Sequence, residues 1–132
     1  MSQQNVEIVR RAYEAFADGN LEAVLNVFHP EVDIRPDAAV PDLGRLRGRD
    51  GWLELAGRWY EPWEEYRIEP EEFIDAGDQV VVLTREFGRR KDTGYEVEQR
   101  IGTVFTFRDG EAVRVEFFLD QAEALEAAGL TE

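Results

Sequence analysis

The sequence predicts a single α+β domain in which helices gather on one face of a curved antiparallel sheet. Apolar residues recur at helical spacing in the first half of the chain, and they alternate with polar residues from Tyr66 onward. No repeat and no linker rich in Gly, Pro or Ser divides residues 1–132, which is the length of one domain. A strongly curved sheet and its helices can enclose a cavity, so we expect the functional site on the concave side.

The first half of the chain predicts three helices. Gln3–Ala17 carries one apolar stripe at helical spacing, and a shorter helix follows from Leu21 to Phe28. Asp50 is suited to cap a third helix, from Gly51 to about Trp63. Tryptophans lie along one face of this third helix: Trp52, Trp59 and Trp63.

The second half predicts an antiparallel meander. A short strand at Glu31–Arg35 and a surface loop at Pro36–Arg49 precede the third helix. After it, turn residues such as Asp109-Gly110 separate four longer strands: Tyr66–Asp75, Gln79–Arg89, Tyr95–Phe107 and Ala112–Leu119. A capping box from Asp120 to Glu123 then opens a short C-terminal helix.

Composition excludes several classes of function. With 15 Lys+Arg against 29 Asp+Glu, the net charge is −14, so the chain repels nucleic acid. Its longest apolar run, Val80–Leu83, is far too short for a membrane span or a signal peptide, and we expect a cytoplasmic protein. Without cysteine, and with His29 as the single histidine, we expect neither a metal site nor a cofactor.

Two stretches carry a resemblance to a known family. They are VRRAYEAFADGNLEAVLNVFHPEVDIRP at 9–36 and GTVFTFRDGEAVRVEFFLDQAEALEAAGL at 102–130. The chain resembles the nuclear-transport-factor-two-like superfamily, and within it the SnoaL-like polyketide cyclase and ketosteroid isomerase branch. The resemblance implies a cone-shaped curved sheet that wraps a hydrophobic pocket, with about three N-terminal helices closing it. Members include isomerases, cyclases and proteins without catalysis, so the resemblance implies a pocket but does not select a reaction.

Tyr13 is the first candidate for catalysis. It resembles the first-helix tyrosine that donates a hydrogen bond to the substrate oxyanion in ketosteroid isomerases. The general-base aspartate of those enzymes falls on Arg35 or Pro36 here, and the second oxyanion donor falls on Thr103. Neither Arg35 nor Pro36 can take a proton from a carbon acid, so we do not expect the known ketosteroid isomerase mechanism.

Asp33 and Asp120 are the candidate catalytic carboxylates, and each has a structural alternative. If Val32 and Ile34 face the core, alternation turns Asp33 toward solvent. Asp120 matches the acidic residue after the last strand in SnoaL-like cyclases, where it acts in proton transfer. It also opens the capping box with Glu123, and we favour this role as the cap of the C-terminal helix.

Ligand-binding candidates come from the third helix and from the register of the two last strands. If Thr103 points inward, every second residue along its strand does too. The predicted contacts are Phe16, Trp52, Trp59, Gln99, Thr103, Phe105 and Phe117. The facing of Thr84 and Glu86 stays open, because the turn at Lys91–Gly94 does not fix their register.

These features favour a protein that binds a small hydrophobic ligand carrying a carbonyl group. One alternative is an isomerase, cyclase or hydratase that uses a pocket carboxylate with Tyr13 as oxyanion donor. Another is a non-catalytic interaction module. Phe118 would lie on the outer face of the sheet among charged residues, which predicts a homodimer contact there.

Overall fold

The computed structural model describes residues 2–37 and 44–130, and it confirms the predicted α+β fold. Its elements, in chain order, are α1 (Ser2–Ala17), α2 (Leu21–Leu25), β1 (Phe28–Arg35), β2 (Leu46–Arg47), α3 (Gly48–Tyr60), β3 (Trp63–Ala76), β4 (Gln79–Arg90), β5 (Glu96–Arg108), β6 (Glu111–Phe118) and α4 (Gln121–Ala127).

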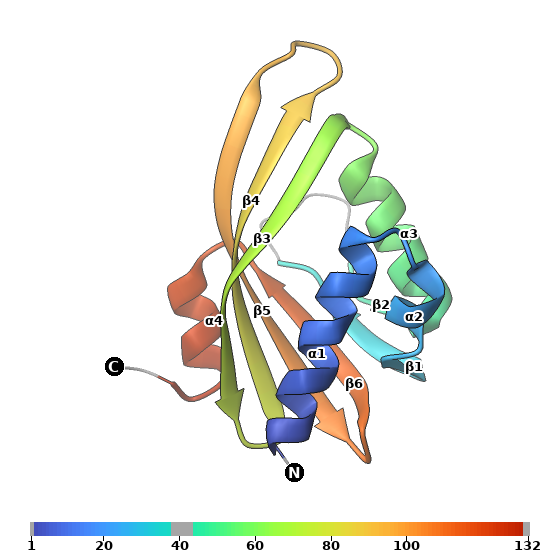
Figure 1. Cartoon of the computed structure of the whole chain (residues 1–132), viewed down its shortest axis with the longest axis vertical. Coiled ribbons are helices and arrows are strands. Elements are labelled where there is room, and N and C mark those ends of the chain that lie inside the picture. The colour runs from blue at the N-terminus through green and yellow to red at the C-terminus, as the bar shows by residue number, and fades with distance from the viewer. Residues whose placement is uncertain (1, 38–43, 131–132) are drawn as a thin grey trace.

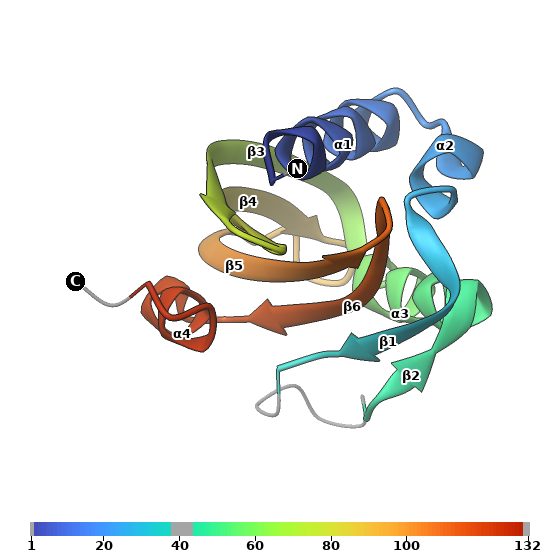
Figure 2. The same ribbon diagram turned by 90° about the horizontal axis from the view of Figure 1, so that it is seen from below.

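All six strands form one curved sheet in the order β2-β1-β6-β5-β4-β3. Neighbouring strands are antiparallel except β1 and β6, which run parallel. Helices α1 and α3 cover the concave side, and α4 lies against the other face (Figures 1 and 2). The β4–β5 hairpin extends beyond the helices, so one end of the sheet projects from the body of the molecule (Figure 1).

The main core lies between the concave face and the helices. It joins Val9 of α1 and Val24 of α2 to strand residues that are almost inaccessible to solvent, namely Val32, Ile34, Val80, Val82 and Val115. Burying one such side chain is worth about 1.5–3 kcal/mol, so this cluster supplies much of the energy that holds the helices on the sheet.

Helix boundaries differ from the sequence prediction at three points. The second helix stops at Leu25, and Phe28 starts β1 instead of ending the helix. The third helix starts at Gly48, with no side-chain cap, so Asp50 lies within its first turn. Trp63 begins β3 and is not part of the helix.

The predicted loop at Pro36–Arg49 also needs correction. Leu46–Arg47 forms a short strand that pairs with Asp33 and Ile34 of β1. Two residues are too few to show an alternating pattern, so the sequence gives no signal for this strand. Residues 38–43 of the predicted loop lie outside the described residues.

A second, smaller cluster holds α4 on the convex face. Val81, Val104 and Ala124 form its centre, and Phe118 packs against them. Phe118 therefore lies on the outer face as predicted, but α4 and its cluster already cover part of the ring. Gly102 allows the close approach of the helix, since a Cβ there would lie 2.4 Å from the Cβ of Ala124. No helix in the described part of the chain is long and apolar enough to cross a membrane.

Candidate functional site

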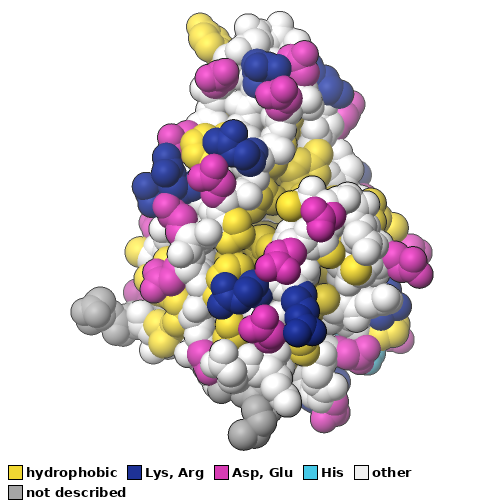
Figure 3. Space-filling view, in the orientation of Figure 1, with side chains coloured by type: hydrophobic (Ala, Val, Ile, Leu, Met, Phe, Trp, Pro, Cys, Tyr) yellow, Lys and Arg dark blue, Asp and Glu magenta, His cyan; other side chains and the backbone are white. Residues whose placement is uncertain are grey.

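The concave face, α1 and α3 enclose a cavity of about 140 Å³. In the space-filling view, hydrophobic side chains line a hollow between β3 and these helices (Figure 3). Most of the wall is apolar, and it includes six Phe and Trp rings: Phe16, Phe28, Trp52, Trp59, Phe105 and Phe117. An apolar cavity of about 150 Å³ can admit benzene, so there is room here for at least one aromatic ring.

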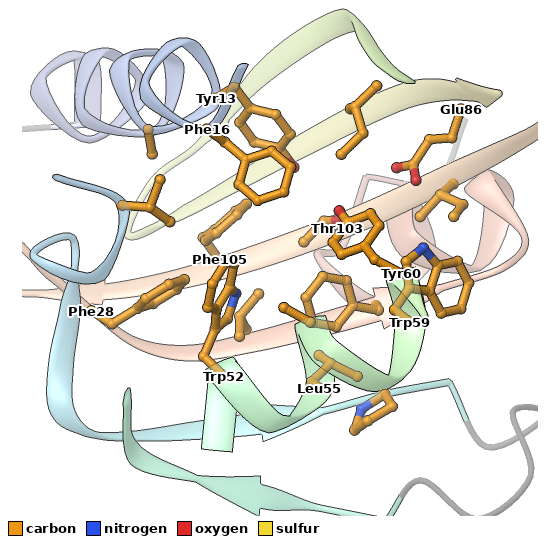
Figure 4. Close-up of a pocket in the computed structure, with 18 of the residues that line it drawn as sticks. Tyr13, Phe16, Phe28, Trp52, Leu55, Trp59, Tyr60, Glu86, Thr103 and Phe105 are labelled. Atoms are coloured by element: carbon orange, nitrogen blue, oxygen red, sulfur yellow. The ribbon is translucent and has the colours of Figure 1, made fainter. Parts of the chain in front are cut away.

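Glu86 supplies a carboxylate at one end of this apolar cavity. It lies on β4, is only 7% exposed, and points its carboxyl group into the cavity (Figure 4). The Tyr66 hydroxyl donates a short hydrogen bond to one carboxyl oxygen, and the Thr84 hydroxyl lies 2.8 Å from the other. Burial raises the pKa of Glu86 above its ordinary value, although these two hydrogen bonds oppose the rise.

The Thr84 hydroxyl can either donate a hydrogen bond to Glu86 or accept one from it. Its oxygen lies 2.8 Å from Glu86 Oε2 and 3.3 Å from the carbonyl oxygen of Ile101. A hydroxyl has one proton to donate. When Glu86 is ionised, Thr84 can donate to it; when Glu86 is protonated, Glu86 can donate to Thr84, which then donates to Ile101. The network thus accommodates either protonation state.

Two tyrosines, Tyr13 and Tyr60, line the cavity, and a third, Tyr66, contacts Glu86. Burial, and then the charge of Glu86, raises the pKa of Tyr13, Tyr60 and Tyr66 well above the ordinary value for a phenol. All three phenols therefore stay protonated at neutral pH and can donate hydrogen bonds. Thr103, which is 2% exposed, lines the cavity from strand β5, and its side chain partly opposes the rise in the pKa of Tyr13.

Aromatic packing fixes the position of Tyr66. Its ring centroid lies 6.4 Å from Trp59, 5.0 Å from Tyr60 and 5.6 Å from Trp63. The Trp63 ring in turn packs on Gly88, where a Cβ would lie only 2.5 Å from the indole. Glycine at position 88 thereby lets Trp63 reach Tyr66, and Tyr66 holds Glu86.

Comparison with known families identifies the fold family of this chain. The family model described as the SnoaL-like domain matches residues 9–115. The chain belongs to the SnoaL-like domain family. No curated protein matches it significantly.

Solved structures agree with this assignment. An NTF2-like (nuclear-transport-factor-two-like) protein of unknown function from Burkholderia pseudomallei K96243 is 29% identical, with a TM-score of 0.77 over 93% of this chain and 95% of that one. An NTF2-like protein from Burkholderia thailandensis E264 is 27% identical, with a TM-score of 0.80 over 92% and 96%. TerC, co-crystallised with polyporic acid, is 26% identical, with a TM-score of 0.78 over 96% and 98%.

Within this SnoaL-like domain, most of the site residues predicted from sequence come together in the cavity. Its wall contains Tyr13, Phe16, Trp52, Trp59, Thr103, Phe105 and Phe117. The predicted ligand contact Gln99 does not line the cavity. It pairs with Glu86 in the sheet, so it lies on the same face as Glu86, but two residues along β5 from Ile101, which does line the cavity.

The two predicted catalytic aspartates lie elsewhere. Asp33 is on the opposite face of β1, where Arg35 and Arg45 each approach Oδ2 to 2.9 Å. Burial raises its pKa, but the hydrogen bonds from these arginines outweigh that effect and leave the pKa below the ordinary value. Asp120 is exposed and accepts a hydrogen bond of 2.8 Å from the Ala122 amide. Asp120 therefore caps α4, as its structural alternative stated, whereas Asp33 faces away from the cavity but lies in an ion pair instead of in solvent.

The carboxylates that line the cavity are Glu86, whose facing the sequence left open, and Asp37, which lies in the predicted loop and was not among the predicted site residues. Asp37 lies at the cavity wall after β1, and its Oδ2 accepts a hydrogen bond of 2.8 Å from the Leu119 amide. Among the described residues, no group of three or more His, Cys, Asp and Glu side chains is arranged to hold a metal ion.

Proposed function

We propose that this SnoaL-like domain binds a small, flat, hydrophobic molecule that carries a carbonyl oxygen. The observation that supports the proposal most strongly is the cavity itself, which is apolar along its length and has protonated hydroxyls at one end. Cavities with this combination of a hydrophobic wall and a few polar groups are typical of small-molecule sites.

Tyr13 is the donor that we assign to the ligand oxygen. Its ring is fixed edge-on between Phe73 and Phe105, with centroid distances of 5.8 and 6.3 Å. Its hydroxyl points toward the space between Thr103 and Phe16 (Figure 4). A buried hydroxyl that loses its partner costs about 1–3 kcal/mol, so a ligand carbonyl at this position gains both orientation and affinity.

A matched pair of probes tests the proposal. Acetophenone and α-methylstyrene have nearly the same shape, and only acetophenone has a carbonyl oxygen. In titrations followed by protein NMR, both compounds should shift signals of the cavity residues. Tyr13→Phe should lower the affinity for acetophenone by about tenfold, which is the effect of losing one hydrogen bond of about 1.4 kcal/mol. The affinity for α-methylstyrene should stay almost unchanged. Equal losses of affinity for both probes would show that Tyr13 does not contact the ligand oxygen. If neither probe binds to wild type, the proposal is refuted.

Glu86 favours a second candidate function, an isomerase, cyclase or hydratase that moves a proton on the bound ligand. Catalytic acids and bases are often buried groups with a raised pKa, as Glu86 is. Its carboxylate would take a proton from the carbon beside the carbonyl, while the electrons move to the carbonyl oxygen held by Tyr13.

Deuterium incorporation tests this second candidate. In D2O, wild type should speed the exchange of the methyl protons of acetophenone, and Glu86→Gln should abolish the acceleration. If acetophenone binds but its exchange is not accelerated, the ligand-binding function stands and proton transfer on this probe is excluded.

A further inference from the structure

The cavity wall carries two carboxylates and no basic side chain. Asp37 and Glu86 are its acidic residues, and no Lys, Arg or His is among the described residues that line it. The whole chain has a net charge of −14, which adds to the negative potential at the site. An anionic ligand would meet repulsion here from both near and distant charges.

Glu86 is also a buried acid without a cationic partner. Its two hydrogen-bond partners, Tyr66 and Thr84, are neutral hydroxyls. In the described part of the chain, no arginine, lysine or histidine forms an ion pair with it, whereas Asp33 on the other face has two arginines. Glutamate is almost never fully buried unless it is paired. The carboxyl group points into the cavity, where a ligand would supply the partner.

The surroundings of Glu86 suit a positive charge. Trp59 and Tyr60 lie beside it in the cavity wall (Figure 4), and Tyr66 is held against both rings. The faces of aromatic rings attract cations, and they do so more strongly when the cation is removed from water. The attraction between an ammonium group and a carboxylate also grows as the local dielectric constant falls.

We propose that the ligand is a hydrophobic amine whose protonated nitrogen pairs with Glu86 while its ring occupies the apolar part of the cavity. This inference rests on the proposed function, because it adds an amino group to the ligand whose carbonyl oxygen meets Tyr13. It also predicts that the site discriminates by charge: cations bind best, neutral analogues bind less well, and anions are rejected.

Three one-ring probes test the order of affinity. At pH 7, benzylamine is a cation, benzyl alcohol is its neutral analogue, and benzoate is an anion. In NMR titrations of wild type at low ionic strength, benzylamine should bind about tenfold more tightly than benzyl alcohol, and benzoate should bind most weakly. This comparison needs no substitution, so it does not depend on how any variant folds.

Two variants that each remove one negative charge test whether Glu86 causes the preference for the amine. Glu86→Gln should reduce the ratio of benzylamine to benzyl alcohol affinity to about one, while it still binds benzyl alcohol. Glu98→Gln removes one negative charge from an exposed residue that is paired with Arg85 and lies outside the cavity, and it should keep the ratio near ten.

Each outcome separates this inference from the function on which it rests. Equal affinity of wild type for benzylamine and benzyl alcohol, or an amine preference that survives Glu86→Gln, would overturn the inference. If acetophenone still binds in that case, the proposed function stands without the amine. If neither acetophenone nor any of the three probes binds, both the inference and the proposed function fail.

Discussion

Replacing Glu86 with glutamine should stabilise the fold at neutral pH. The side chain is 7% exposed and its partners are neutral, so ionisation inside the protein is costly. Glutamine has the same shape and no charge. Its oxygen can accept from Tyr66, and its NH2 group can donate to Thr84, whose proton can then go to the Ile101 carbonyl at 3.3 Å.

The size of the effect depends on pH in a defined way. Burial raises the folded-state pKa of Glu86 above its unfolded value of about 4.3. Below about pH 4.3 the group is protonated in both states, so wild type and Glu86→Gln should differ little. As pH rises from there through the folded-state pKa, the unfolded chain ionises first and wild type loses stability. The loss is about 1.4 kcal/mol for each unit between the two pKa values, and it is constant at higher pH.

Urea denaturation at intervals from pH 4 to 8 measures this difference directly. The free energy of unfolding of Glu86→Gln minus that of wild type should be small at pH 4, increase with pH and then level off. The control Glu98→Gln changes an exposed ion pair and should stay within about 0.5 kcal/mol of wild type. A difference that is independent of pH, or a glutamine variant less stable at pH 8, would refute the assignment of Glu86 as a buried acid with a raised pKa.

Three further predictions concern the convex face and the C-terminal helix. Gly102→Ala places a Cβ 2.4 Å from Ala124, so it should displace α4 and lower stability by about 1–3 kcal/mol in thermal unfolding. Asp120→Ala removes the cap of α4 and should lower the free energy of unfolding by about 1 kcal/mol without changing the affinity for acetophenone. A loss of affinity would show that Asp120 takes part in ligand binding. We predict a homodimer through the outer face, with Phe118 in the contact, and light scattering that shows a monomer at micromolar concentration would contradict it.

Long periodic segments explain why the fold could be predicted. The first helix and the last two strands show their patterns over many residues, and their observed bounds are within one or two residues of the prediction. Trp63 was placed wrongly because it lies four residues after Trp59, which fits a helical face. Pro62 was the missed signal: Glu61 still donates its N–H to the Gly57 carbonyl, but Pro62 has no N–H with which to continue the helix.

The register of β4 explains why the sequence left the facing of Glu86 open. A strand shifted by one residue turns every side chain to the other face, and the turn before Tyr95 did not fix the length of the connection. The observed register pairs Val82 with Thr103 and Glu86 with Gln99. Since Val82 and Glu86 are four residues apart on one strand, Glu86 lies on the same face of the sheet as Thr103. For Asp120 the capping pattern was visible in the sequence, and it describes what the residue does in the fold.

A crystal structure grown with acetophenone would show directly where the cavity holds a ligand. We expect one probe molecule in the cavity, with its ring among the Phe and Trp side chains of the wall. Its ketone oxygen should lie about 2.5–3.0 Å from the Tyr13 hydroxyl. Electron density for the probe only on the outer surface, or a ketone oxygen in the cavity that no hydroxyl reaches, would show that the cavity does not bind carbonyl compounds in this way.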